Sequence, residues 1–129
     1  HLSNLTFAPR VPKQQVQAVL SRCDLLYFSV HVSRVWRYGQ SLNKVIDYML
    51  AGKPVLASYT GYPSMINEAG NGTYVPAGDV AALRSEILRY AEMPLAEREV
   101  IGRRGREWIL MNRKYGTLAQ DYLKILFPA

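Results

Sequence analysis

The stretch "RYGQSLNKVIDYMLAGKPVLAS" (residues 37–58) joins a glycine turn, a polar cluster, an apolar stripe and a β-rich run. The stripe has helical spacing and predicts a helix from about Ser41 to Ala51, which ends at Gly52. The buried residues of this helix would be Val45, Tyr48 and Met49. "KPVLAS" predicts a strand whose proline takes the first position, where a missing N–H is tolerated. A helix followed directly by a strand is typical of α/β folds.

The sequence before this stretch predicts two strands with a helix between them. Residues 4–7 ("NLTF") are short and favour β-structure, and residues 11–22 form an amphipathic run with one apolar stripe. Residues 23–30 ("CDLLYFSV") are almost continuously apolar, as in strands that are covered on both faces. We therefore expect 23–30 to be an interior strand. The helical stripe before it consists of Val16, Val19 and Leu20.

The sequence after residue 58 continues the alternation. Residues 60–72 predict a Gly/Pro turn, a short helix and a glycine-rich exit, and residues 73–76 ("TYVP") predict a brief strand. Asp79 is the predicted N-cap of the next helix, within residues 77–93. Its apolar stripe consists of Val80, Leu83, Ile87 and Leu88. Two further helices are expected, near Leu95 to Met111 and Leu118 to Leu126.

Strands that alternate with helices predict right-handed βαβ units, and so an α/β fold with a parallel sheet and flanking helices. Ligands of such sheets bind beyond the carboxyl ends of the strands. We therefore expect the loops after Val30 and Ser58 and the helix start at Ser41 to share the ligand edge.

Composition limits the class of protein. With 129 residues, 49% of them hydrophobic, the chain suffices for one domain or part of one. No run approaches the roughly 20 apolar residues of a membrane span, and no secretory signal pattern is present, so we expect a soluble, cytoplasmic protein. The lone Cys23 can form neither a disulfide nor a zinc site within the chain, and a core position is expected for it.

The net charge of +6 allows nucleic acid, phosphorylated ligands or an anionic membrane surface as partners, and does not choose among them. Much of the excess lies in "REVIGRRGREW" (residues 98–108), for which a solvated helix face is favoured over a binding patch.

The start of the helix in the opening stretch is a candidate phosphate site. With Ser41 as N-cap, the first backbone N–H groups of the helix are free, and the positive end of the helix dipole lies there. Gly39 permits a close approach, Lys44 adds a positive charge, and Asp47 can accept hydrogen bonds from a ribose diol. The free N–H groups would be those of Leu42, Asn43 and Lys44. On spacing alone, Ser41 as a simple cap and Asp47 as the partner of Lys44 remain an alternative.

Three blocks, "LTFAPRVPKQQVQAVLSRCDLLYFS", "RYGQSLNKVIDYMLAGKPVLAS" and "TGYPSMINEAGNGTYVPAGDVAAL", together resemble the C-terminal, donor-binding half of retaining GT-B-fold glycosyltransferases. The resemblance is to group 1 enzymes of the bacterial surface-polysaccharide type. It implies a Rossmann-like sheet that lacks its first two βα units and the acceptor domain. It also implies that residues 1–129 are a partial nucleotide-sugar-binding domain of a longer enzyme and are inactive alone.

The family usually carries two glutamates with seven residues between them in this region. Here the second position is Asp47, to which the resemblance assigns the ribose, whereas the first is Gly39, which has no carboxylate. "YGQSLNK" is similar to the "YG-x-S-P-N-K" of one branch, apart from Leu42 in place of proline. Backbone N–H groups around Gln40 to Lys44, and the Asn43 side chain, would then supply the sugar contacts.

The resemblance also assigns roles to loops. Arg10 and Val11 lie where the family grips the nucleotide base, and the turn Thr60, Gly61, Tyr62 would line the donor pocket. His31 and Arg34 face the cleft in this interpretation.

The function expected from the resemblance is retaining, hexosyl-type transfer from a nucleotide-diphosphate sugar. The acceptor would be a cell-envelope polysaccharide, such as lipopolysaccharide, or a lipid-linked saccharide bound through the missing N-terminal domain. Asp47 and Lys44 would be the catalytic residues, and no metal or other cofactor is expected. Peripheral association with the inner face of the cytoplasmic membrane is left open, and nucleic acid is not an expected partner.

Two alternatives remain at this point. One is a sugar-nucleotide epimerase of the same fold, which would use similar diphosphate contacts. The other is a basic nucleic-acid-binding module, whose charges lack interleaved aromatic residues for base stacking. That module would be built on Arg98, Arg103, Arg104 and Arg106.

Overall fold

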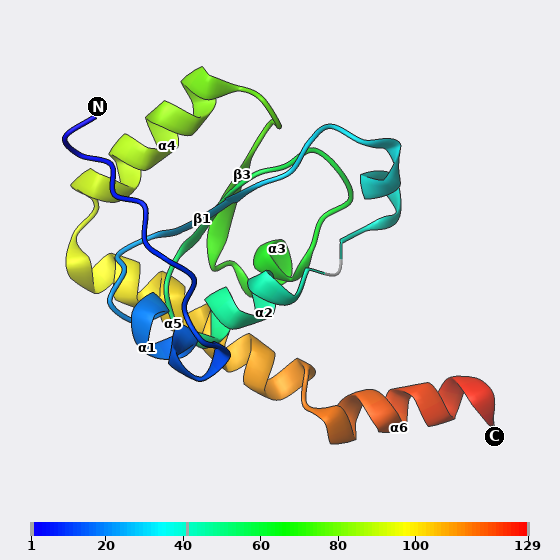
Figure 1. Cartoon of the computed structure of the whole chain (residues 1–129). Helices are drawn as coiled ribbons and strands as arrows, with labels where there is room; N and C mark the ends of the chain where they lie inside the picture. The colour runs from blue at the N-terminus through cyan, green and yellow to red at the C-terminus, as the bar shows by residue number, and fades with distance from the viewer. Residues whose placement is uncertain (1, 41, 129) are drawn as a thin grey trace.

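A parallel three-stranded sheet lies at the centre of the chain (Figure 1). The structure is a computed structural model and describes residues 2–40 and 42–128. The strands are β1 (Leu26–Ser29), β2 (Val55–Ser58) and β3 (Gly72–Val75), in the order β1–β2–β3. Both strand pairs are parallel, so the predicted α/β fold with a parallel sheet is confirmed.

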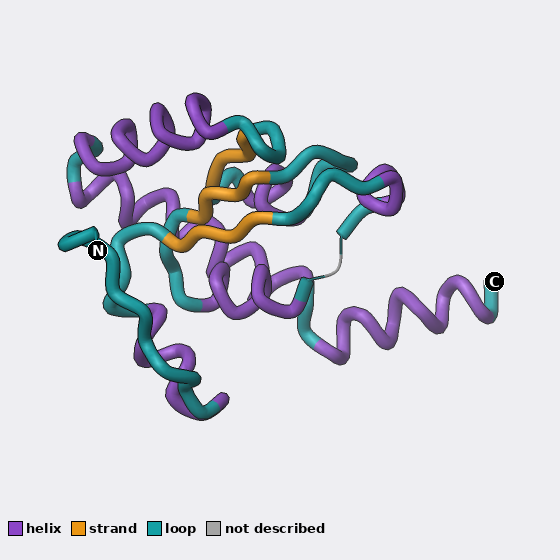
Figure 2. The backbone as a smooth tube through the Cα atoms, turned by 45° about the horizontal axis from the view of Figure 1, so that its top comes forward, coloured by secondary structure: helices purple, strands orange, loops and turns teal. Residues whose placement is uncertain are grey.

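Helices connect the strands and cover the sheet in two layers. Helix α4 lies on one side of the sheet, and α2 and α5 lie together on the other (Figure 2). In chain order the helices, with η for 3-10 helices, are η1 (Lys13–Gln15), α1 (Val16–Leu20), η2 (Arg34–Tyr38), α2 (Asn43–Leu50), α3 (Met65–Ala69), α4 (Val80–Glu92), α5 (Leu95–Asn112) and α6 (Tyr115–Leu126).

The core lies between the sheet and the α2–α5 layer. All four residues of β2 are buried, because this central strand has a neighbour on each side and a helix over each face. Val45 and Met49 of α2 are completely buried against it, as predicted, whereas Tyr48 is only half-buried. Full burial of one such side chain contributes about 1.5–3 kcal/mol. The core cluster consists of Phe28, Val45, Met49, Val55, Ala57, Tyr59, Met65, Ile66 and Ile109.

Strand β1 is at the edge of the described sheet, so the prediction of an interior strand was wrong. Leu26 and Phe28 are buried, whereas Tyr27 and Ser29 are exposed. The exposed pair faces the α4 side, where α4 packs over β2 and β3 and leaves β1 open. Cys23 precedes the strand and is half-buried, outside the core cluster.

The predicted strand at residues 4–7 is absent. Residues 4–7 are exposed and irregular, and Phe7 is 87% exposed. A strand needs a neighbour for its N–H and C=O groups, and among the described residues none pairs with this segment.

The sequence located the start of α4 but not its buried face. The Asp79 carboxylate accepts a hydrogen bond from the Ala82 N–H at 2.9 Å, which confirms the N-cap. Within the helix, Tyr90 is buried and Leu83 half-buried, while the rest of the predicted stripe is exposed. The predicted stripe was wrong for Val80, Ile87 and Leu88. Helix α4 packs on β2 and β3 through the face that carries Leu83 and Tyr90, and these three residues remain exposed.

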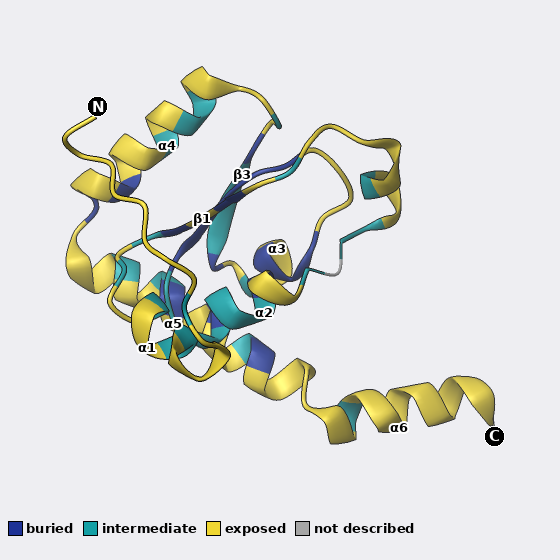
Figure 3. Ribbon diagram, in the orientation of Figure 1, coloured by how far each residue is buried: buried dark blue, intermediate teal, exposed yellow. Residues whose placement is uncertain are grey.

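The last helix extends away from the body of the chain (Figure 1). It begins at Tyr115, three residues before the predicted start at Leu118, and none of its residues is buried (Figure 3). Helix α5, by contrast, packs closely on α2 and α3.

Candidate functional site

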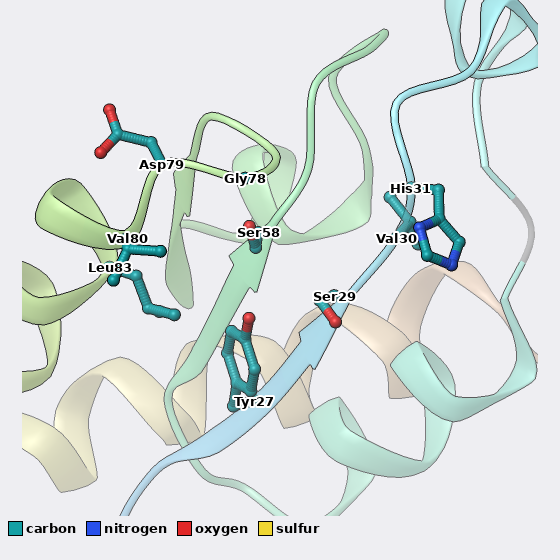
Figure 4. A pocket seen from close by; sticks show the side chains of 9 residues that line it. All are labelled: Tyr27, Ser29, Val30, His31, Ser58, Gly78, Asp79, Val80 and Leu83. Atoms are coloured by element: carbon teal, nitrogen blue, oxygen red, sulfur yellow. The ribbon is translucent and has the colours of Figure 1, made fainter.

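A pocket of about 290 Å³ opens at the carboxyl ends of β1 and β2, on the α4 side (Figure 4). Val30 and Ser58 both line it, as expected for loops that share the ligand edge. Tyr27 and Ser29 stand on β1, and the imidazole of His31 lies at the opposite side from Leu83 of α4. This pocket does not include the start of α2, so the predicted ligand edge is divided between the two faces of the sheet. Arg34 lies in η2 and is exposed.

Helix α2 begins at Asn43, with Leu42 at the N-cap position. Ser41, the predicted cap, lies outside the described residues. Leu42 has extended backbone and its side chain packs against the core, so only its backbone can reach a ligand. Asn43 and Lys44 are exposed, and their N–H groups lie in the first turn, where helix geometry leaves donors without intrahelical acceptors.

Asp47 lies one turn deeper in α2, and its partner is not Lys44. The Lys13 Nζ is 2.6 Å from the Asp47 Oδ2, and the Gln17 side chain donates to the Asp47 backbone oxygen at 3.0 Å. These contacts tie η1 and α1 to the C-terminal half of α2. The Lys13 side chain is 74% exposed, so the ion pair contributes little to stability, about 0–1 kcal/mol.

Lys13 also lines a pocket of about 430 Å³ with Arg10 and Val11. The structure therefore brings the loop predicted to grip the base next to the carboxylate predicted to hold the ribose. Lys13 itself was not predicted. Its position just after the Arg10–Val11 loop is the signal that could have found it.

A third pocket, of about 370 Å³, lies between η2 and α3, and Gly39 and Gln40, which precede α2, line it. We call it the η2–α3 pocket. Gly39, Gln40 and Tyr62 are all predicted site residues. They meet in this pocket although Tyr62 comes 22 positions after Gln40 in the sequence. The pocket is lined by Tyr38, Gly39, Gln40, Tyr62, Pro63, Ser64, Met65, Glu68 and Arg113. Glu68 and Arg113 were not predicted, since neither belongs to a local motif.

The turn after β2 is held against η2 by its backbone. The Tyr62 N–H donates to the Trp36 backbone oxygen at 2.8 Å, and the Tyr59 hydroxyl donates to the same oxygen at 3.2 Å. A Cβ at Gly61 would lie 2.5 Å from that oxygen, so the close approach requires glycine. The Thr60 hydroxyl accepts from the Ala77 N–H at 3.0 Å, which ties the turn to the loop after β3. Thr60 and Gly61 therefore shape the turn that presents Tyr62.

A hydrogen-bonded network fixes the floor of the η2–α3 pocket. The Gln40 Nε2 donates to the Tyr74 hydroxyl at 2.8 Å, and this hydroxyl is also hydrogen-bonded to Ser64. Burial raises the pKa of Tyr74 to about 12, against the opposing effect of these hydrogen bonds. A neutral tyrosine hydroxyl both donates and accepts hydrogen bonds, so Tyr74 can serve Gln40 and Ser64 at once.

The arginines of residues 98–108 do not form one free patch. The Arg98 guanidinium donates to the Tyr90 backbone oxygen at 3.0 Å, and Arg106 donates to that of Leu50 at 3.0 Å. Arg103 and Arg104 are exposed. Two of the four arginines are therefore engaged in joining α5 to the rest of the fold.

Residues 1–93 match the model of a known protein family, whose description is glycosyl transferases group 1. The chain belongs to this family. The match covers the sheet, α2 and the three pockets, apart from Arg113, and it ends just after α4. Comparisons with curated proteins and with solved structures give no match.

Family membership identifies the chain as a glycosyltransferase in general terms. Among residues 2–40 and 42–128, no group of three or more His, Cys, Asp or Glu side chains is placed to hold a metal ion. Within the same described ranges, no helix is both long and apolar enough to cross a membrane.

Proposed function

We propose that this chain is the donor-binding part of a longer glycosyltransferase that uses a nucleoside-diphosphate sugar. The observation that carries the proposal is the arrangement along α2. The Arg10–Val11 pocket reaches Asp47 through Lys13, one turn into this helix. The first N–H groups of the helix lie at its start, and Gly39 and Gln40, which precede that start, line the η2–α3 pocket. A nucleoside, a diphosphate and a sugar would occupy these three places in the order of the donor molecule.

Chemical character supports the same order. The Asp47 carboxylate can accept two hydrogen bonds from a ribose diol, and Asn43 lies about 6 Å from it along the helix axis, at four residues of 1.5 Å rise. The N–H groups at the helix start and the Lys44 ammonium favour an anion there. Tyr38 and Tyr62 are exposed aromatic residues in the η2–α3 pocket, as suits the apolar face of a sugar ring.

In the proposed reaction, the bond between the sugar C1 and the diphosphate oxygen breaks. A new bond forms between C1 and an acceptor oxygen, whose proton leaves. Negative charge grows on the diphosphate during this step, so Lys44 and the helix-start N–H groups bind the transition state better than the ground state. No metal or other cofactor is part of the proposal.

We extend the proposal to the whole enzyme on the resemblance described above. The reaction retains configuration at C1 and acts on a cell-envelope polysaccharide or a lipid-linked saccharide. The acceptor binds to a domain outside residues 1–129, at the cytoplasmic face of the membrane. Residues 1–129 alone therefore transfer no sugar.

Asp47→Ala in the intact enzyme tests the proposal. We expect donor affinity, measured by calorimetry with uridine- and guanosine-diphosphate sugars, to fall about 10- to 100-fold, because a hydrogen bond to a charged group is worth roughly 1.5–3 kcal/mol. Asp47→Glu should retain most of the affinity, since it keeps the carboxylate.

Asp121→Ala is the control, because it also removes a carboxylate paired with a lysine but lies in α6, outside the three pockets described above. Donor affinity of Asp121→Ala should stay within a few-fold of the unmodified enzyme. If Asp47→Ala keeps full affinity and only lowers the melting temperature, Asp47 serves merely to join α1 to α2. Release of free nucleoside diphosphate with a new glycosidic bond is the expected product pattern. An isomerised sugar nucleotide would identify an epimerase instead.

A further inference from the structure

The η2–α3 pocket has no carboxylate at position 39, and its backbone explains why. Gly39 has φ 104° and ψ −177°, a region that is essentially restricted to glycine. Nothing lies within 4 Å of the place of a Cβ there, so conformation rather than crowding restricts this position. An acid that serves this pocket must therefore come from another segment of the chain.

Most polar groups of the pocket are already engaged. The Gln40 amide donates to Tyr74, the Ser64 side chain is hydrogen-bonded at the start of α3, and the Tyr62 backbone oxygen accepts from the Tyr59 hydroxyl at 2.9 Å. Their hydrogen bonds build the walls of the pocket. Among these groups, the buried Gln40 Oε1 has no hydrogen-bond partner within residues 2–40 and 42–128, so it is a second acceptor that a ligand could use.

Glu68 differs from these groups. It lines the pocket from α3, its side chain is exposed, and within residues 2–40 and 42–128 its carboxylate has neither an ion pair nor a hydrogen bond. Arg113, the positively charged residue of the same pocket, stacks over Trp108 at 5.4 Å instead of pairing with it. Glu68 is thus the one acid of the pocket and is free to accept hydrogen bonds from a ligand.

The surroundings of Glu68 suit a carbohydrate. A carboxylate accepts hydrogen bonds from neighbouring hydroxyl groups, and an aromatic ring beside it packs against the C–H face of the sugar. Tyr62, 63% exposed, supplies such a ring in the same pocket. A few oriented polar groups among apolar walls are typical of small-molecule sites.

We propose that the Glu68 carboxylate binds hydroxyl groups of the sugar that is transferred, and so takes part in selecting the donor sugar. The inference rests on the proposed function, because it places the sugar beyond the diphosphate at the start of α2. It makes Glu68 responsible for binding the sugar and not the nucleotide.

The test compares sugar nucleotides with bare nucleotides. Dissociation constants of the intact enzyme and its Glu68→Gln variant are measured for UDP-glucose, UDP-N-acetylglucosamine and GDP-mannose, each beside UDP or GDP. For the sugar nucleotide that binds the unmodified enzyme, Glu68→Gln should weaken binding about tenfold or more. Affinity for the bare nucleoside diphosphate should change less than twofold. Glu68→Asp keeps the charge on a shorter side chain. Its affinity for the sugar nucleotide should lie between that of the unmodified enzyme and that of Glu68→Gln.

Glu92→Gln is the control, since Glu92 is an exposed acid at the end of α4 and lines none of the three pockets described above. Glu92→Gln should change neither the affinity for the sugar nucleotide nor the affinity for the bare nucleoside diphosphate. Glu68 lies in the first turn of α3, where an acid can also stabilise the helix. Loss of that stabilisation would lower the affinities for sugar nucleotides and for bare nucleotides alike.

Two outcomes overturn the inference at different levels. If Glu68→Gln binds the sugar nucleotide as tightly as the unmodified enzyme does, the role of Glu68 is refuted and the proposed function stands. If the unmodified enzyme binds neither the three sugar nucleotides nor UDP and GDP, the proposed function fails, and the inference fails with it.

Discussion

At position 39 the backbone decides which residue can be present. Its positive φ would strain any residue other than glycine, which agrees with the absence of the first acid of the two-glutamate pattern. At Asp47, by contrast, the side chain is what matters. Its carboxylate is held in place by Lys13, 34 residues earlier in the sequence. An ion pair of this kind can be exchanged for ligand hydroxyl groups at small cost, because it is exposed to solvent on one side.

Tyr74 gives a prediction on pH. Burial raises the folded-state pKa of Tyr74 from 10.0 to about 12, so above pH 10 the unfolded chain loses this proton more readily than the folded chain does. The stabilising contribution is complete below pH 10 and is lost as the pH rises through about 12. The free energy of unfolding, from urea titrations between pH 9 and pH 12, should therefore fall more steeply for the unmodified chain than for Tyr74→Phe.

At pH 7, Tyr74→Phe should cost about 0.5–1.5 kcal/mol, through loss of the hydrogen bonds to Gln40 and Ser64. Tyr115→Phe, at a position that is 92% exposed, should leave stability at pH 7 unchanged. Equal slopes above pH 9 for Tyr74→Phe and the unmodified chain would contradict the assignment.

At the scale of elements, α5 packs closely on the segments beneath it. Two buried glycines of α5 make this possible: Gly102 faces the backbone of Gly52, and Gly105 faces the side chain of Asn71. The backbone bend at Gly52, with φ 67°, ends the α2 region and places its carbonyl under α5. The position of α2, and with it the candidate diphosphate site, therefore depends on the α5 contact.

Gly102→Ala tests this dependence. The added Cβ would lie 2.0 Å from the Gly52 backbone oxygen, and a backbone obstacle cannot move aside as a flexible side chain can. We expect a loss of about 2–3 kcal/mol in the free energy of unfolding, within the range for overpacked cores, and a melting temperature roughly 10 °C lower.

Gly116→Ala in α6 is the matched control, since nothing lies within 4 Å of its Cβ. It should leave stability unchanged or raise it slightly through helix propensity. If Gly102→Ala has the same melting temperature as the unmodified chain, α5 does not pack this closely.

The molecule as a whole has a well-covered centre and two open regions. β2 is covered on both faces, whereas β1 has no strand beyond it within residues 2–40 and 42–128 and has an open face at Tyr27 and Ser29. Helix α6 forms the second open region, with no buried residue along its length. The three pockets lie around the covered centre and are lined by residues between Arg10 and Arg113, so the candidate site does not depend on α6.

Truncation after Lys114 should consequently shift the melting temperature, followed by circular dichroism, by no more than about 2 °C. Truncation after Met93, which also removes α5 and its buried Ile109, should abolish the cooperative transition because the core loses the helix that packs on α2 and α3. A drop of more than about 5 °C on loss of α6 alone would mean that this helix docks on the body in solution.

The sequence by itself determined the order of the α-helices and strands after residue 10, the Asp79 cap, the turn at Gly52, the parallel α/β class and the family. These features depend on contacts within a few residues or on apolar periodicity, which can be recognised locally. Only the tertiary structure decided that β1 is an edge strand, that Lys13 is the partner of Asp47, and that Glu68 and Arg113 join Gly39 in one pocket. Such contacts join segments far apart in the chain, and packing of whole elements brings them together. No local pattern encodes which residue of one element will face which residue of another.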